Sequence, residues 1–455
     1  MNYTSRFIKH IVYPSMSRWR GNRVLENVRT LKASERFSLD RLEALQLEKL
    51  KKLLRHSFLH VPAYQDFRHR LEDVERNPRS VFAEIPILRK AAFRDNRDRY
   101  LSDEANEKEM FLNRSGGSTG EPVTFYMNRY AVEFSEAARW RGLSWSGIQP
   151  WDPCLMIWGS PIELAQHQML SFRLRERWLK NRVLIPAFAL DQQKISEYRR
   201  RIERFQPAYI YGWPSSMSIL AQLLLSSGGP LRVQLKGVVS TAETLSDAHR
   251  DLLKEAFGAP VINEYGAREG GILAYECPAG NLHVTAENSW LEVVHPQTYQ
   301  PVPEGESGLL VVTDLNNFVM PRLRYELGDL VSLSSRTCRC GRTLPILEAI
   351  DGRSDDTFIT DQGILVNGQY FTNIARLLPS VTKFQIVQQS PSQILLRLKD
   401  VGLTEQDVQS FCTQIRDKMG NVSIEVERVT DIPAAASGKV RVAMRQFPLP
   451  SKHAD

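Results

Sequence analysis

The residues between Asn113 and Pro122 are the densest group in the chain that could hold phosphate. They include three glycines and three hydroxyl side chains: Ser115, Gly116, Gly117, Ser118, Thr119 and Gly120. Glycine lets the backbone approach a ligand closely, and hydroxyls with bare N–H groups suit phosphate oxygens. No Lys-Ser or Lys-Thr pair follows the last glycine, so this is not a Walker A loop. A hairpin loop between two strands explains the same residues, and the stretch alone leaves both interpretations open.

A second group lies on the predicted strand-to-loop turn Asn263–Gly271. It holds Tyr265, Arg268 and Glu269 within a few positions. The aromatic ring could stack on a base, the arginine could meet a phosphate, and the carboxylate could hold Mg²⁺. Taken singly, such a group is more often a turn with solvated charges.

Three further polar segments each supply one charged side chain of interest. Asp329 could accept both hydroxyls of a ribose. Arg353 lies in a polar, turn-rich segment that continues to Asp355, and Lys439 stands between two small or apolar residues near the C-terminus.

Four residues have the types of a structural zinc site. Cys277, His283, Cys338 and Cys340 supply three sulfurs and one imidazole, which form a closed tetrahedral set for Zn²⁺. The one-residue spacing between Cys338 and Cys340 is tighter than usual, and the alternative is four unconnected residues with inert thiols. We predict zinc with a structural role, bound within a hairpin that spans residues 277–340.

A histidine pair is a weaker candidate for metal binding. His56 and His60 lie four residues apart on a predicted helix or at its end. Because no third ligand stands nearby in the sequence, we predict solvent-facing or capping histidines.

Composition narrows the class of partner. The chain has 455 residues, a net charge of +7 and a pI near 9.1, which suits anionic small ligands. The basic residues form no long block, so no nucleic-acid partner is expected. Basic and aromatic residues gather between Tyr3 and Arg23, where at most a peripheral membrane contact is expected. A basic tail that packs its aromatic rings explains that segment better.

The sequence also predicts a compartment. No apolar run approaches 18 residues, and the N-terminus lacks the pattern of a secretory signal. Five cysteines, an odd number in a long chain, argue against a disulfide framework and for a reducing compartment. A cytoplasmic location is therefore expected.

Hydrophobic spacing predicts the elements that position these residues. An amphipathic helix is predicted over residues 39–58 and ends before Val61-Pro62. From about residue 120 to 330, short β-rich runs alternate with helical stretches, which predicts an α/β architecture with a mostly parallel sheet. The predicted strands are residues 123–127, 154–158, 208–211, 237–240, 261–264 and 308–313, and the predicted helices are residues 131–140, 192–205, 215–226 and 246–257.

The pattern of predicted strands and helices changes at the polar turn 352–356, which indicates a domain boundary there. The residues beyond it fit a compact α+β unit of roughly 100 residues. Its predicted elements are strands 384–387, 394–398 and 422–426 and a helix over 404–418. We predict an N-terminal domain over residues 1–352 and a C-terminal domain over 353–455, with the turn as a hinge.

Taken in their order along the chain, the Gly-rich stretch and the polar motifs described above resemble those of the adenylate-forming superfamily of acyl-CoA synthetases, firefly luciferases and nonribosomal adenylation domains. The Gly-rich stretch is similar to that family's phosphate loop, and the motifs Tyr-Gly-x-x-Glu, Arg-Tyr-x-x-Gly-Asp, Gly-Arg-x-Asp and Ser-Gly-Lys follow in the family's order. Segments 46–64, 211–215 and 338–342 resemble the phenylacetate–CoA ligase branch, which includes relatives encoded with capsular polysaccharide genes. The match covers residues 113 to 441.

The resemblance implies a large adenylation domain, a mobile C-terminal lid and a two-step reaction. A carboxylate attacks the α-phosphate of ATP to give an acyl-adenylate and pyrophosphate, and a thiol, usually that of coenzyme A, then takes the acyl group. The first step needs a cation at the α-phosphate and Mg²⁺ on the leaving pyrophosphate.

The resemblance also assigns a role to each matched residue. Lys439 would be the cation at the α-phosphate, Ser115 to Gly120 would hold the β- and γ-phosphates, and Asp329 would hold the ribose. The remaining assignments are Tyr265 beside adenine, Gly266 and Arg353 in the nucleotide site, Arg268 and Glu269 in catalysis with Mg²⁺ on Glu269, and Asp355 as the pivot of the lid. Members of this branch carry a similar Cys…His…Cys-x-Cys arrangement that binds zinc.

Two positions depart from the family pattern. Glu121 stands where many relatives carry a phosphate-facing lysine, and Arg268 stands where a phosphate-binding threonine is common. Arg268 could compensate for the missing lysine.

We predict a carboxylate–CoA ligase whose acid pocket draws on residues 158–161 and 211–215. One alternative transfers the acyl group to an amine or hydroxyl on a sugar or carrier in polysaccharide biosynthesis. The other is a nucleotide-binding relative without catalysis. The expected partners are a small carboxylic acid, ATP and CoA or another acyl acceptor. The identity of the acid and the oligomeric state stay open, with a homodimer among the alternatives.

Overall fold

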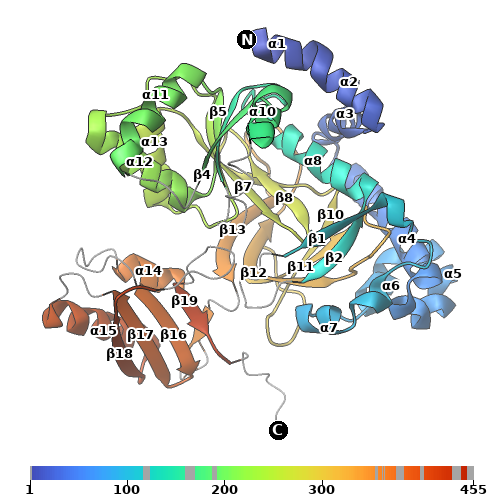
Figure 1. Ribbon diagram of the computed structural model, residues 1–455. Coiled ribbons are helices and arrows are strands. Elements are labelled where there is room, and N and C mark those ends of the chain that lie inside the picture. The colour runs from blue at the N-terminus through green and yellow to red at the C-terminus, as the bar shows by residue number, and fades with distance from the viewer. Residues whose placement is uncertain are drawn as a thin grey trace.

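The computed structural model describes residues 3–115, 123–158, 170–186, 192–353, 357–360, 362, 364–375, 384–399, 404–432 and 442–447. Figure 1 shows a large N-terminal part built around one long sheet and a smaller lobe formed by the C-terminal elements. The predicted α/β class is confirmed. None of the described helices combines the length and apolar character needed to span a bilayer.

The N-terminal segment is helical. The helix predicted over residues 39–58 is α4 (Leu39–His60), which begins where the Ser38 hydroxyl accepts a hydrogen bond from the Arg41 N–H at 3.3 Å. Leu50, Leu54 and Phe58 of its apolar face are fully buried. The other helices of this segment are α1 (Tyr3–Phe7), a π-helical turn (Ile8–Val12), α2 (Tyr13–Arg20), α3 (Val24–Ser34), α5 (Leu71–Arg76), α6 (Pro78–Glu84), α7 (Lys90–Asp95) and 3-10 turns over Pro62–Arg70, Arg97–Tyr100 and Glu107–Glu109.

One long sheet ties the N-terminal part together. Within the described ranges it has eleven strands in the order β10-β11-β12-β13-β9-β8-β7-β6-β5-β3-β4. The strands are β3 (Cys154–Trp158), β4 (Arg182–Pro186), β5 (Tyr209–Gly212), β6 (Gly237–Thr241), β7 (Val261–Ala267), β8 (Gly271–Glu276), β9 (Leu282–Val284), β10 (Ser289–Val294), β11 (Gly308–Asp314), β12 (Tyr325–Ser334) and β13 (Ile346–Arg353).

The sheet is mixed rather than mostly parallel. The pairs from β7 to β4 are parallel, whereas the pairs from β10 to β7 are antiparallel. Antiparallel neighbours need no crossover helix, so the strand–helix alternation that predicted the parallel part carried no signal for the rest. The predicted strand 123–127 is β2 (Thr124–Asn128), which pairs with β1 (Met110–Arg114) in a separate hairpin.

Helices cover both faces of the parallel part. Ile157 and Val238 pack with α11, α12 and α13 on one face, whereas Tyr211 and Val239 pack with α3 and α8 on the other. This alternation follows from the two-residue period of a strand. The covering helices are α8 (Arg129–Ser144), α10 (Leu170–Leu179), α11 (Ile195–Phe205, after a 3-10 turn Gln192–Lys194), α12 (Pro214–Gly228) and α13 (Asp247–Phe257).

The C-terminal lobe has its own core around Phe358, Phe371 and Phe411. Its four-stranded sheet has the order β18-β17-β16-β19, and β14 and β15 form a separate pair. The elements are β14 (Thr357–Ile359), β15 (Leu365–Asn367), α14 (Gln369–Ala375), β16 (Phe384–Ser390), β17 (Gln393–Lys399), α15 (Glu405–Met419), β18 (Ser423–Val429) and β19 (Ala443–Arg445). The domain boundary at residues 352–356 stays a prediction, because residues 354–356 lie outside the described ranges.

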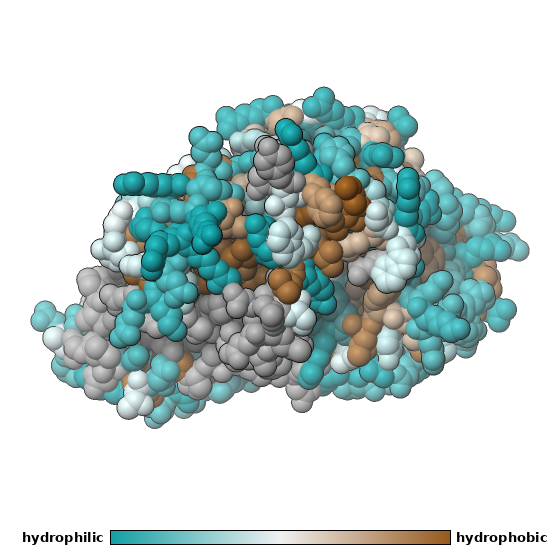
Figure 2. Space-filling view, turned by 45° about the horizontal axis from the view of Figure 1, so that its top comes forward, coloured by the Kyte–Doolittle hydropathy of each residue, from teal (hydrophilic) through white to brown (hydrophobic). Residues whose placement is uncertain are grey.

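The surface agrees with the charged composition. Figure 2 shows a mostly hydrophilic face on which hydrophobic residues gather near the middle instead of spreading evenly.

Candidate active site

The residues predicted to bind a nucleotide lie where the sheet changes from parallel to antiparallel. β7 pairs with β6 in parallel and with β8 in antiparallel, and the register shifts between Tyr265 and Gly266. A Cβ atom added to Gly266 would lie 2.7 Å from the carbonyl oxygen of Gly271. The turn can therefore close this tightly only with glycine at position 266.

Tyr265 and Asp329 are in direct contact. The Tyr265 hydroxyl donates a hydrogen bond of 2.6 Å to Asp329 Oδ2, across 64 positions of sequence. Asp329 is buried on β12, opposite Arg353 of β13. The structure thus brings together an aromatic ring and a carboxylate that were predicted to hold adenine and ribose.

Glu269 lies beside a cation that sequence reasoning missed. Lys90 Nζ, at the start of α7, is 3.7 Å from Glu269 Oε1. Arg322 Nη2 donates to the backbone carbonyl of Glu269 at 2.8 Å, which fixes the turn from the other side. No motif or spacing links residue 90 to residue 269, so only the fold could reveal this pair.

Ser115 stands at the base of the Gly-rich loop. It is buried, its hydroxyl oxygen accepts a hydrogen bond from the Val123 N–H at 2.7 Å, and its own N–H donates to the Val123 carbonyl at 2.8 Å. These bonds extend the β1–β2 hairpin by one pair. The loop is therefore flanked by a hairpin, and residues 116–120 with Glu121 lie outside the described ranges.

The remaining predicted residues divide into two groups. Arg268 is exposed on the turn between β7 and β8. Arg353 ends β13, where its backbone pairs with Asp329. Asp355 and Lys439 lie outside the described ranges, so their predicted roles stay predictions.

A cavity of about 800 Å³ opens beside this turn, between α8 and the strands of the parallel part. Trp158 and Tyr211, from the two segments expected to form an acid pocket, line it together with Met156. Gly266 and Arg268 also line it, so the cavity begins at the predicted nucleotide site.

The middle of the cavity contains a buried carboxylate. Glu264 Oε1 accepts hydrogen bonds from the Tyr211 hydroxyl at 2.6 Å and the Thr241 hydroxyl at 3.0 Å, and Arg139 Nε lies 3.5 Å from Glu264 Oε2. Burial and the neighbouring Glu264 charge raise the pKa of Tyr211, so its hydroxyl keeps its proton and acts as a donor.

The far end of the cavity is cationic. Arg182, the first residue of β4, lines the cavity, and no side-chain hydrogen bond or ion pair joins it to another described residue. Burial acts to lower the pKa of its guanidinium, but the neighbouring Tyr209, Cys154, Glu136 and Glu176 outweigh burial and raise that pKa. Glu136 instead pairs with Arg139 at 2.7 Å.

Cys277, His283, Cys338 and Cys340 meet in one cluster, and their ligand atoms all lie within 4.8 Å of one another. The Cys277 and Cys338 sulfurs are 3.8 Å apart, which is too far for a disulfide. This sulfur–sulfur distance equals the separation of about 3.8 Å expected between two thiolates bound to one tetrahedral Zn²⁺. Cys340 Sγ is 3.2 Å from His283 Nε2.

Neighbouring groups orient these ligands. His283 Nδ1 lies 2.9 Å from the Leu344 carbonyl, which can only accept, so Nδ1 carries the proton and Nε2 keeps its lone pair. Burial lowers the pKa of His283 and raises the pKa of Cys277 to about 11. Burial also acts to raise the pKa of Cys338, but hydrogen bonds from the Cys340 N–H and other donors outweigh it and lower that pKa. The donor set fits Zn²⁺.

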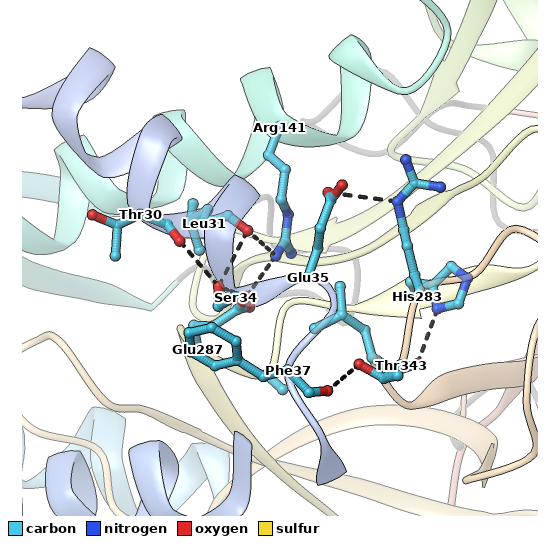
Figure 3. Close-up of polar contacts among 12 residues, drawn as sticks. Thr30, Leu31, Ser34, Glu35, Phe37, Arg141, His283, Glu287 and Thr343 are labelled. Atoms are coloured by element: carbon cyan, nitrogen blue, oxygen red, sulfur yellow. Dashed lines mark hydrogen bonds and ion pairs between the residues drawn. The ribbon is translucent and has the colours of Figure 1, made fainter. Parts of the chain in front are cut away.

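A buried ion pair ties α8 to the antiparallel part next to this cluster. Figure 3 shows Arg141 reaching from α8 to Glu287, with Nη1 and Oε1 2.7 Å apart. The Ser34 hydroxyl donates to the same oxygen at 2.5 Å. The side chains of Arg141 and Glu287 are 1% and 2% exposed, so the pair is shielded from solvent.

The chain is similar to several known proteins. Residues 358–446 match the family described as the CapK C-terminal domain. A phenylacetate–coenzyme A ligase of Thermus thermophilus is 29% identical over 365 residues, which cover 78% of this chain and 79% of the relative. The protein CapK of Staphylococcus aureus is 24% identical over 378 residues, which cover 80% of each chain.

Among solved structures, a 2-hydroxyisobutyryl-CoA ligase in the postadenylation state superposes with a TM-score of 0.67 at 21% identity and covers 91% of both chains. This likeness confirms the fold. The sequence relatives and the C-terminal match confirm the resemblance of the chain to the phenylacetate–CoA ligase and CapK branch of the adenylate-forming superfamily.

Proposed function

We propose that the protein activates a carboxylic acid with ATP to form an acyl-adenylate and then transfers the acyl group to coenzyme A. The observation that carries this proposal is that the Tyr265–Asp329 contact and the cavity lie next to each other. Tyr265, which contacts Asp329, directly precedes Gly266, Ala267 and Arg268, and these three residues line the cavity. A nucleotide held by Tyr265 and Asp329 and an acid held in the cavity would meet at the turn between β7 and β8.

The roles of the residues follow from their chemistry. Tyr265 lies against adenine, Asp329 accepts from the ribose hydroxyls, and Arg268 meets the phosphates. Glu269 binds Mg²⁺, which offsets charge on the leaving pyrophosphate. We add Lys90 to this site, because its ammonium group beside Glu269 supplies a cation near the phosphates where Glu121 replaces the family's lysine.

Two parts of the proposal rest on the resemblance alone. Ser115 to Gly120 hold the β- and γ-phosphates, and Lys439 approaches the α-phosphate when the lid closes about Asp355. A lysine there offsets the charge that builds up during in-line attack by the carboxylate.

The cavity favours an acid with a polar far end. With the carboxylate at the turn near Arg268, an extended acid would pass Met156 and Tyr211 and end near Arg182. The Arg182 guanidinium forms no ion pair with a described residue, so its N–H groups could donate to an anionic or strongly accepting group on the substrate. We therefore propose an elongated acid with a second acceptor group, in preference to an unsubstituted aryl acid.

The test is a product assay on the full chain. The protein is incubated with ATP and Mg²⁺, with and without CoA, and with matched panels of aryl, straight-chain and dicarboxylic acids. We expect AMP to form and acyl-CoA to appear by mass spectrometry, with dicarboxylic acids turned over best. Arg182→Ala should remove that preference and leave turnover of the monocarboxylic acids unchanged.

A second acceptor is favoured by one observation, the match of the lid to the CapK domain. In this alternative the acyl group goes to an amine or hydroxyl. AMP formation that requires an acid but leaves CoA unconsumed would support it, whereas acyl-CoA formation supports the first proposal. No AMP with any acid would favour the non-catalytic alternative.

We also propose that Cys277, His283, Cys338 and Cys340 hold a structural Zn²⁺. The sulfur–sulfur separation, the oriented His283 lone pair and the absence of a disulfide between the described cysteines support this assignment. Bound zinc would link the β8–β9 turn to the β12–β13 connection.

A further inference from the structure

A second cluster of metal-ligating side chains lies at the end of α4, away from the zinc cluster. His56 and His60 stand one helical turn apart, with ring centroids separated by 5.1 Å. The Asp103 N–H donates to the His60 carbonyl at 2.8 Å, which brings Asp103 and Glu104 against the helix. The third ligand that the sequence lacked nearby thus comes from 44 positions further along the chain.

The proton on His56 can be placed from its surroundings. Its Nε2 lies 2.8 Å from the carbonyl oxygen of Phe318, which can only accept, so Nε2 carries the proton. Its Nδ1 therefore holds a lone pair and lies 3.7 Å from Glu104 Oε2. The ring is only 16% exposed and packs edge-on against Phe318.

His60 repeats this arrangement with its nitrogens exchanged. Nδ1 lies 2.9 Å from Asp103 Oδ1, and a carboxylate accepts, so Nδ1 carries the proton. The lone pair on Nε2 lies 3.6 Å from Glu104 Oε1. The His60 side chain is 29% exposed, so the site stays open on one side.

Both lone pairs therefore face one carboxylate without a proton between them. Separations of 3.6 and 3.7 Å are too long for hydrogen bonds. Ligands about 2.1 Å from one metal ion are separated by about 3.4 Å in a tetrahedral shell, so the gap has the size of a cation. In metal sites the second ring nitrogen of each histidine donates to a carbonyl or carboxylate, as His56 and His60 do here.

We propose that His56 Nδ1, His60 Nε2 and the Glu104 carboxylate bind a divalent transition-metal ion of the Zn²⁺ or Ni²⁺ class. Asp103 and the Phe318 carbonyl orient the rings and do not bind the ion. Two imidazoles and one carboxylate select such ions over Mg²⁺ or Ca²⁺, which prefer oxygen ligands alone.

The ion would join three segments: the end of α4, residues 102–105 and the loop after β11. That loop supports β2, because the Phe318 N–H donates to Asn128 Oδ1 at 3.0 Å. Metal binding would thus stiffen the support of the hairpin that carries the Gly-rich loop. The site does not depend on the proposed activity.

The test is calorimetric titration of ZnCl₂ and NiCl₂ into tag-free full-length protein, purified with its cysteine cluster loaded. We expect one additional site per chain, with affinity at least about tenfold weaker in His60→Ala and in Glu104→Gln. Two matched controls, His69→Ala and Glu109→Gln, change exposed side chains of the same types nearby and should titrate like the parent.

Glu104 is exposed, so Glu104→Gln is expected to fold, and an unchanged melting temperature without added metal verifies this. The parent should gain thermal stability from either ion, and Glu104→Gln should not. No additional site in the parent, or equal affinity in the parent and Glu104→Gln, would overturn the proposal.

Discussion

The parallel and antiparallel halves of the long sheet differ in the contacts that hold their strands in place. In the parallel half, β7 to β4, helices cover both faces and the strands leave a cavity under α8. In the antiparallel half, β8 to β10, short connections bring distant residues together, and buried polar groups join the pieces. The candidate nucleotide residues lie at the border, where Tyr265 of one half contacts Asp329 of the other.

The comparison teaches which half depends on hydrophobic packing and which on specific links. Side chains of the parallel half alternate between two apolar cores, and the buried contacts of Glu264 with Tyr211 and Thr241 add to that packing. The antiparallel half holds the Cys/His cluster and Glu287, the buried partner of Arg141, so specific polar contacts join its pieces.

The largest effect should follow loss of the Cys/His cluster. Wild-type protein should contain about one equivalent of zinc, and Cys338→Ser should contain less than half, because an open three-ligand set binds far more weakly. Hydrogen exchange should accelerate in β8, β9 and β13 but not in β5 and β6.

Cys412→Ser is the matched control, because Cys338 and Cys412 are both 7% exposed and only Cys338 lies in the cluster. It should keep its zinc. Equal zinc content in the two variants, or equal acceleration of hydrogen exchange in both halves of the sheet, would contradict the view that the Cys/His cluster holds the antiparallel half in place.

Breaking the buried ion pair should have the next largest effect. Arg141→Met leaves Glu287 buried and charged, which should lower the free energy of unfolding by about 3–5 kcal/mol. Chemical denaturation measures this change. Replacing both partners, Arg141→Met with Glu287→Met, should recover part of the loss.

Arg23→Met breaks an exposed Arg23–Glu26 pair and should lower the free energy of unfolding far less, because solvent screens this pair. If Arg141→Met cost no more than this control, the link between α8 and the antiparallel half would be unimportant.

Glu269→Gln tests the candidate nucleotide site at the border between the two halves of the sheet. Loss of the carboxylate that we propose binds Mg²⁺ should lower kcat/KM for adenylation about 10²- to 10³-fold while the fold is kept. The matched control Glu72→Gln changes an exposed glutamate and should behave as wild type. Steady-state AMP formation is the measurement, and a change below threefold, roughly 0.65 kcal/mol, would exclude Glu269 from the site.

The smallest effect is expected within the cavity. Tyr211→Phe removes the hydrogen bond to Glu264 and should raise KM for the acid about tenfold, with KM for ATP unchanged. Tyr198→Phe, a buried tyrosine on the opposite face of the same half, should change neither constant. Equal changes in KM for the acid in both variants would show that the acid does not bind in this cavity.

The same division explains what the sequence could predict. Strands 154–158, 208–211, 237–240 and 261–264 appear as β3, β5, β6 and β7, because each is a short apolar run between helices. In the antiparallel half, β11 was predicted as residues 308–313, whereas β8, β9, β10, β12 and β13 were missed, because no helix separates them. In the parallel half, β4 was also missed.

The site followed a similar rule. Motif order predicted Tyr265 and Asp329, and ligand type predicted the four Cys/His residues; the structure brings them together as two clusters. The pairs Lys90–Glu269 and His60–Glu104 could not be predicted, because tertiary packing alone brings these residues together. The cytoplasmic location, the homodimer and the membrane contact stay predictions.

The most direct test of the central claim is acid-dependent exchange of labelled pyrophosphate into ATP, without CoA. We predict exchange with at least one acid in wild-type protein, less than about one hundredth of it in Lys439→Ala, and full exchange in the control Lys254→Ala. Lys439→Ala should still bind ATP. Wild-type protein that exchanges with no acid, or Lys439→Ala that exchanges as fast as wild type, would contradict this account.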